Sequence, residues 1–181
     1  MIVYHVVTDR PMTVGQRIVF DETHHSGVYR RVMDKLSVVE DIYAHPDRYV
    51  AEELEHHTSV ALRELALEEV RQKKYPQFPS RLACLYVSPT YEEAESWGDF
   101  FARIGRPTYA IVKIEAKGNC FIGEATRCFD GRTVKEENLA LAEQYWDIPQ
   151  TGDIKHEVRE ILVDGELEVL ETVKVINANI E

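Results

Sequence analysis

Apolar residues follow two different spacings along the chain and predict a mixture of strands and helices. Short runs rich in β-branched residues indicate buried strands over residues 2–7 and 82–88. Helical spacing predicts one helix over residues 26–44 and a second, long and solvent-facing helix over residues 47–74. Pro46 can occupy the first turn of the second helix, and a proline-rich segment ends it.

The rest of the chain adds two predicted helices and several strands. Thr90 and Glu93 form a capping box for a helix that ends at Gly105. Asp164-Gly165 is a two-residue hairpin signal between the last two strands. This order predicts a single α+β domain over residues 1–181, with helices on a partly antiparallel sheet. The remaining predicted elements are an extended piece at 14–20, strands at 108–115, 119–124, 157–163 and 166–176, and a helix at 133–146.

Composition narrows the class of protein. The 181 residues are 44% hydrophobic and 29% charged, which suits one globular domain with a core. No apolar run approaches the roughly 18 residues that span a membrane, and the first residues resemble a strand more than a signal peptide. Asp and Glu exceed Lys and Arg by 32 to 21, so nucleic-acid binding is not expected without a local basic patch. The sparse cysteines, with no CxxC, predict a reduced cytoplasmic protein without disulfides, in which Cys84 is buried in a strand.

Several sequence motifs of catalytic sites are missing. The chain has no GxGxxG, P-loop lysine or GxSxG, which weakens Rossmann, NTPase and hydrolase interpretations. Adjacent histidines at 24–25 and 56–57 do not face one point on a helix, so no metal site is predicted. The acidic residues between positions 52 and 69 are interpreted as a solvated helix face.

Three polar residues interrupt apolar strands and are the candidates for chemistry. His5 lies within Val-Tyr-His-Val-Val, Tyr86 precedes the capped helix, and Glu160 opens Glu-Ile-Leu-Val. Taken singly, they could be a hydrogen-bonded strand histidine, a core aromatic and an exposed strand residue.

Together, these residues resemble the His-Tyr-Glu signature of ADP-ribosyltransferase-like domains of the diphtheria-toxin and poly-ADP-ribose polymerase type. Trp97, eleven residues after Tyr86, is similar to the second aromatic residue of those families. The chain also resembles an uncharacterised bacterial family of the same clan. The resemblance implies an α+β fold with a split β-sheet and flanking helices.

The resemblance also implies a function, NAD-dependent ADP-ribosyl transfer or NAD glycohydrolysis, with NAD as substrate and no metal. Glu160 would be the catalytic carboxylate that stabilises positive charge on the ribose. His5 would position the ribose, and Tyr86 with Trp97 would stack on nicotinamide. Arg30-Arg31 could bind the pyrophosphate, or form an ordinary surface pair.

Two departures from the family pattern keep alternatives open. Val6-Val7 follows His5 where many members carry a glycine, which favours a non-catalytic nucleotide-binding or protein-interaction module. Position 158 is Val158, so the Gln-x-Glu or Glu-x-Glu of arginine-modifying enzymes is missing. An RNA-phosphate transferase of the same clan is a third possibility, which the net charge of −11 opposes. The acceptor is left open among protein, nucleic acid, small molecule and water.

Overall fold

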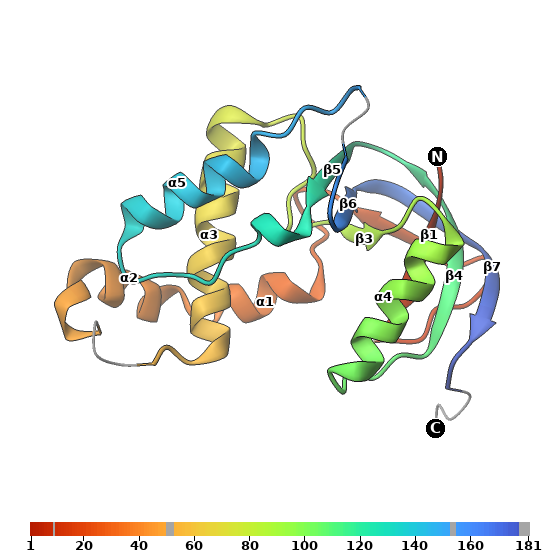
Figure 1. The fold of residues 1–181 in the computed structure, drawn as a ribbon, viewed down its shortest axis with the longest axis horizontal. Helices are drawn as coiled ribbons and strands as arrows, with labels where there is room; N and C mark the ends of the chain where they lie inside the picture. Colours follow the sequence, from red (N-terminus) through yellow and green to blue (C-terminus); the bar gives the residue numbers. More distant parts are fainter. Residues whose placement is uncertain (9, 50–52, 153–154, 178–181) are drawn as a thin grey trace.

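A layer of helices lies beside two antiparallel sheets in the computed structural model, which describes residues 1–8, 10–49, 53–152 and 155–177 (Figure 1). One sheet has the strand order β1-β4-β7-β2 and the other β3-β6-β5. The α+β class is therefore confirmed. The strands are β1 (Ile2–Val7), β2 (Arg17–Phe20), β3 (Leu85–Val87), β4 (Ala110–Lys117), β5 (Cys120–Glu124), β6 (Arg159–Val163) and β7 (Gly165–Val175). The helices are α1 (Gly27–Met33), α2 (Leu36–Ala44), α3 (His56–Lys74), α4 (Tyr91–Arg103) and α5 (Lys135–Trp146), with short 3₁₀ turns at Pro46–Arg48 and Ala125–Arg127.

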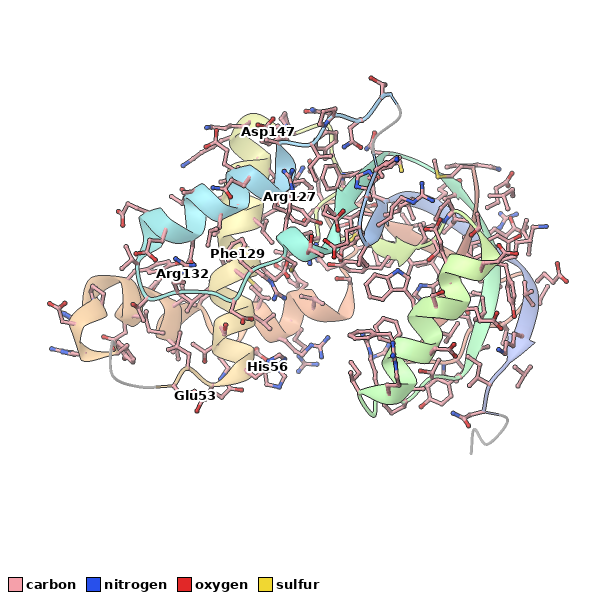
Figure 2. The ribbon with its side chains drawn as sticks, viewed as in Figure 1. Glu53, His56, Arg127, Phe129, Arg132 and Asp147 are labelled. Atoms are coloured by element: carbon pink, nitrogen blue, oxygen red, sulfur yellow. The ribbon has the colours of Figure 1, made fainter. Side chains whose placement is uncertain are left out.

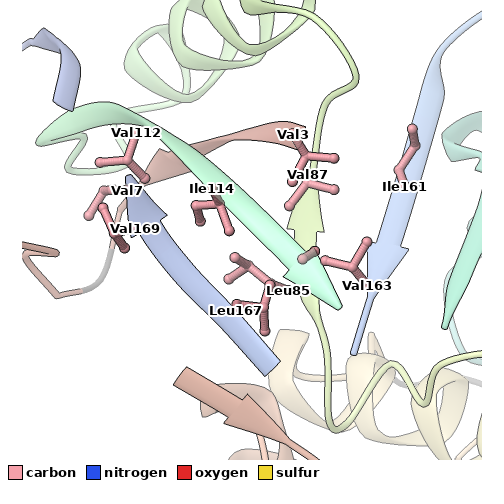
Figure 3. Close-up of a cluster of buried hydrophobic side chains, with 11 residues drawn as sticks. Val3, Val7, Leu85, Val87, Val112, Ile114, Ile161, Val163, Leu167 and Val169 are labelled. Atoms are coloured by element: carbon pink, nitrogen blue, oxygen red, sulfur yellow. The ribbon is translucent and has the colours of Figure 1, made fainter. Parts of the chain in front are cut away.

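The inner faces of the two sheets pack against each other. Alternate residues along a strand point to opposite faces, and the apolar ones of β1, β4 and β7 meet those of β3 and β6. Burial of these side chains holds the sheets together. Figure 3 shows this cluster, which consists of Val3, Val7, Leu85, Val87, Val112, Ile114, Ala116, Ile161, Val163, Leu167 and Val169.

Among the residues that the structure describes, one isolated bridge joins the edges of the two sheets. Tyr4 on β1 and Ser88, directly after β3, exchange two backbone hydrogen bonds of 2.8 Å. The two strands separate on either side of this bridge, so the sheets are linked but split.

The Asp164-Gly165 signal marks a turn between sheets, and the hairpin prediction is wrong. Strand β6 pairs with β3 and β5, whereas β7 pairs with β4 and β2. The Asp164 carboxylate accepts a 2.7 Å hydrogen bond from the backbone N–H of Asn119, in the link from β4 to β5. The link from β4 to β5 and the turn from β6 to β7 therefore cross between the two sheets at the same place. An Asp-Gly pair specifies a tight turn, but the strands' apolar faces decide which neighbours they pair with.

Helix boundaries differ from the expected ones at two places. The helix predicted over 26–44 is two helices, α1 and α2, and the chain between them is not helical. The helix predicted over 47–74 starts only at His56, while residues 50–52 lie outside the described part of the chain. It starts there because the Glu55 side chain accepts hydrogen bonds from the first-turn N–H groups, at 2.9 and 3.1 Å. The predicted cap at Thr90 is confirmed by a 3.2 Å bond from the Glu93 N–H.

Helix α3 is central to the helical layer, so the prediction of a solvent-facing helix is wrong. It packs against α1 and α2 on one side and α5 on the other. Its residues accordingly belong to two apolar clusters. One acidic residue of the supposedly solvated face, Glu64, is only 2% exposed. Because α3 is packed on two sides, more of its surface is buried than the single apolar stripe of a surface helix.

The structure also shows the state of the cysteines and the character of the helices. The three thiols are unpaired. Cys84 is buried, as predicted, but it lies immediately before β3 and not within the strand. No helix within the described residues combines the length and apolar character needed to cross a membrane.

Candidate functional site

A buried arginine connects the helical layer to the sheet β3-β6-β5. Arg81 lies in the loop between α3 and β3 and is 4% exposed. Its Nε donates to Glu64 Oε2 at 2.9 Å and its Nη2 to Glu64 Oε1 at 3.3 Å. A buried guanidinium without a counter-ion would be strongly destabilising, so this forked pair is what makes its burial possible.

Glu160, on β6, binds the other side of the same guanidinium. Its Oε1 accepts hydrogen bonds from Arg81 Nη1 and from the Tyr145 hydroxyl, both at 2.6 Å. Within the described residues its Oε2 accepts no hydrogen bond, and the side chain is 13% exposed. One carboxylate oxygen is therefore fixed by the protein, and the other is available to a further donor.

Glu64 and Arg81 are ionised because their charges compensate each other. Burial opposes ionisation of Glu64, but Arg81 and then Arg63 outweigh it and lower the pKa of the Glu64 carboxyl. Burial likewise disfavours the charge on Arg81, yet Glu64 and other neighbours, Glu160 among them, raise its pKa well above the ordinary value. Burial raises the pKa of Tyr145, an effect that Glu160 reinforces. Tyr145 therefore keeps its proton and can donate it in a hydrogen bond to Glu160.

The ring of Tyr86 lies against this cluster. The guanidinium carbon of Arg81 is 5.3 Å from the centroid of the Tyr86 ring and 4.9 Å from that of Tyr145. Tyr86 pairs with Leu162 across β3 and β6, so its side chain shares a face of the sheet with Glu160, two residues from Leu162. Burial raises the pKa of its hydroxyl well above 10, so that group is neutral.

His5 lies where β1 separates from β3, next to the bridge at Tyr4. Its Nδ1 is 2.7 Å from the backbone oxygen of Tyr86. A carbonyl oxygen can only accept, so Nδ1 carries the proton in this hydrogen bond. Tyr86 thus contacts His5 through its backbone and Arg81 through its ring. The three signature residues belong to one connected set, with Arg81 between Tyr86 and Glu160.

Trp97 and the two arginines are not part of that set. Trp97 packs in a cluster with Tyr4, Val6 and Ile111 under α4. His5 alternates with Tyr4 and Val6 along β1, so it points to the opposite face from Trp97. Arg30-Arg31 is exposed in the last turn of α1, and no ion pair among the described residues joins it to Glu160.

Sequence reasoning missed Glu64, Arg81 and Tyr145. A usable signal existed for Glu64, because it lies three residues from both Ala61 and Leu67 and so shares their helix face. No comparable signal identified Arg81, which lies in a loop after two prolines. Tyr145 resembles any aromatic core residue of a helix.

A hollow of about 560 Å³ borders the cluster on the side of α5. The Cys128 thiol, which lines it, is 3.8 Å from Arg81 Nη2. Figure 2 labels three other lining residues, Arg127, Phe129 and Asp147. Across the part of the chain that the structure describes, no group of three or more His, Cys, Asp or Glu side chains could hold a metal ion.

Comparison with known proteins places the chain in a family. No curated protein matches it. The model of a family described as "Protein of unknown function (DUF2441)" matches residues 3–175, nearly the whole chain. The chain therefore belongs to the DUF2441 family.

Proposed function

We propose that this protein uses NAD as a substrate and transfers its ADP-ribosyl group to an acceptor or to water. The observation that carries the proposal is the state of Glu160. Arg81 and Tyr145 hold one of its oxygens, the other accepts no hydrogen bond within the described residues, and the ring of Tyr86 lies against the same arginine.

Such a carboxylate suits cleavage of the bond between nicotinamide and ribose. As that C–N bond breaks, its electron pair leaves with nicotinamide and the ribose becomes positively charged. A fixed negative group beside the ribose stabilises that state without reorganising. The acceptor then forms the new bond to the ribose and gives up a proton, for which Glu160 Oε2 is a suitable base.

The other signature residues take supporting roles in this proposal. Tyr86 supplies an aromatic surface for the nicotinamide ring. His5, oriented by its bond to the Tyr86 carbonyl, positions the ribose. Stacking by Trp97 and pyrophosphate binding by Arg30-Arg31 stay predictions, to which the placement of these side chains adds no support.

The arrangement of strands is consistent with an ADP-ribosyltransferase-like split sheet in a single domain. If the bridge from Tyr4 to Ser88 is counted as a contact, the strands follow the order β2-β7-β4-β1-β3-β6-β5. The signature residues then lie on β1, β3 and β6, three neighbouring strands at the split. This placement supports the proposed fold family, which by itself does not establish an activity.

A module that binds nucleotide or protein without turnover is the second candidate. The 2.6 Å pair with buried Arg81 favours it, because such a pair also suits a purely structural glutamate.

Calorimetry of the purified protein with NAD, followed by an assay of nicotinamide release, separates the two. The proposal expects saturable binding and release above background with water or an added acceptor. Binding without any release would leave only the module, and neither binding nor release would exclude both the proposed activity and a module that binds NAD.

A further inference from the structure

We propose that Glu64 is a positioning residue that sets the orientation and charge of Glu160 through Arg81. The catalytic consequence rests on the proposed function, whereas the coupling between the two carboxylates does not. Glu64 is the more deeply buried of the two, at 2% exposed, and it lies on α3, whereas Glu160 lies on β6.

The planar guanidinium of Arg81 links the positions of the two carboxylates. The guanidinium of Arg81 is planar, so fixing two of its nitrogens fixes the third. Glu64 binds Nε and Nη2, at 2.9 and 3.3 Å. The remaining nitrogen, Nη1, then points at Glu160 Oε1 and the Tyr145 hydroxyl, at 2.6 and 2.5 Å. The position of Glu160 Oε1, and with it the direction of Oε2, therefore depends on Glu64.

The charge of Arg81 also links the two carboxylates. Arg81 carries one positive charge and contacts two carboxylates, so its charge is shared between Glu64 and Glu160. Arg63 compensates Glu64 from the other side, through a 3.0 Å contact that does not involve Glu160. Without the Glu64 charge, Glu160 would be the only carboxylate among the described residues that contacts Arg81. Arg81 would then offset the negative charge of Glu160 more completely. A carboxylate offset in this way stabilises a positive ribose less well.

A double-mutant cycle without NAD tests the coupling. The variants are Glu64→Gln, Glu160→Gln and both together, with the midpoint of thermal unfolding as the readout. Either single variant leaves Arg81 one carboxylate, whereas the double variant leaves it buried with none. We expect the midpoint of the double variant to fall by more than the sum of the decreases in the two single variants, or the double variant to be unfolded.

A matched control uses Glu69, another acidic residue of α3. It pairs with Lys73 and Lys135, at 2.6 and 3.0 Å, and those partners do not contact Glu160. Glu69→Gln combined with Glu160→Gln should give additive losses. Additive losses in the Glu64 cycle as well would overturn the inference, whatever the protein does to NAD.

Turnover tests the catalytic half. Glu64→Gln should lower the rate of nicotinamide release about tenfold or more and keep NAD affinity within about threefold. A residue with only a structural role would not separate rate from affinity in a folded variant. Glu69→Gln should release nicotinamide at the wild-type rate.

Two other outcomes are decisive. Wild-type turnover in folded Glu64→Gln would overturn the catalytic half of the inference. If the wild type releases no nicotinamide, the proposed function fails, and the cycle alone decides whether Glu64 positions Glu160.

Should Glu64→Gln not fold, Arg81→Lys replaces it, because an ammonium keeps the charge but cannot bridge both carboxylates in fixed directions. It should show the same loss of rate at nearly constant affinity.

Discussion

The hydroxyl of Tyr145 lies between two charged groups. It accepts a 2.5 Å hydrogen bond from Arg81 Nη1 and donates one of 2.6 Å to Glu160 Oε1. The tyrosine is fully buried, so no water replaces either bond. A phenol in this position can serve both partners because it keeps its proton.

Tyr145→Phe keeps the ring and removes the hydroxyl. Two charged groups then lose a partner in a buried place, and we expect the free energy of unfolding to fall by about 1–3 kcal/mol. Urea unfolding followed by circular dichroism measures the loss. Tyr91→Phe is the control, since its hydroxyl bonds Glu95, whose side chain is 39% exposed, so that water can replace the bond. Equal losses in the two variants would contradict a special role for the buried hydroxyl.

At this scale, the sequence shows which residues are unusual but not what they bind. His5, Tyr86 and Glu160 stand out because each interrupts an apolar strand. Glu64 does not stand out, because other acidic residues surround it on α3. Its partner Arg81 is 17 residues away, and Tyr145 is 64 residues beyond Arg81. Such pairings depend on the tertiary fold, and hydrophobic periodicity does not show which distant residues meet in it.

At the scale of elements, helix starts and tight turns are set by a few polar contacts. At the start of α3, the backbone N–H of His57 and then Lys35 lower the pKa of Glu55 from its ordinary 4.5 to about 2. A carboxylate with a lowered pKa stabilises the folded state fully above its unfolded value of 4.5, and this stabilisation is lost as the pH falls towards about 2.

Glu55→Gln keeps an acceptor oxygen and removes the charge. We expect a lower melting temperature than the wild type at pH 7, with the difference shrinking as the pH falls from 4.5 to about 2. Thermal melts by circular dichroism across that range provide the measurement. Glu53→Gln, an exposed change two residues earlier, is the control. A difference that does not vary with pH would argue against the cap.

A substitution at Gly165, in the turn from β6 to β7, should also destabilise the protein. Its φ is +76°, and an added Cβ would lie 2.4 Å from the carbonyl oxygen of Lys117. Gly165→Ala should lower the free energy of unfolding by about 2–4 kcal/mol, from left-handed strain and overpacking together. Gly15→Ala has a similar φ of +82° but nothing within 4 Å, so it reports the strain alone. Chemical denaturation of both should show the larger loss at Gly165, and the reverse order would contradict the crossing between sheets.

The same turn shows why elements are easier to predict than their partners. The strand over 2–7 and the helix opened by Thr90 are confirmed, because apolar spacing and a cap are local signals. Strand β7 instead joins β4 and β2, which precede it by many residues. That choice depends on which apolar faces meet in the core between the sheets.

At the scale of the whole molecule, the candidate site lies where the helical layer meets a sheet. Glu64 comes from α3, Tyr145 from α5 and Glu160 from β6, while Arg81 comes from the loop between α3 and β3. Tyr145 itself belongs to the apolar cluster that α3 and α5 form with this sheet, and Tyr86 packs against that cluster. Packing of the layers and geometry of the site are therefore linked, and a change that separates α3 from the sheet would disturb Glu160.

The most direct test of the account compares wild type with Glu160→Gln for nicotinamide release from NAD, with affinity measured in parallel by calorimetry. A group that acts on charge in the transition state affects the rate and barely affects ground-state binding. We predict a turnover loss on the order of a hundredfold or more, with affinity within a few-fold. Glu171→Gln, an exposed change on β7, should match the wild type. Equal turnover by wild type and Glu160→Gln, or NAD binding by the wild type without any release of nicotinamide, would contradict the proposed role of Glu160.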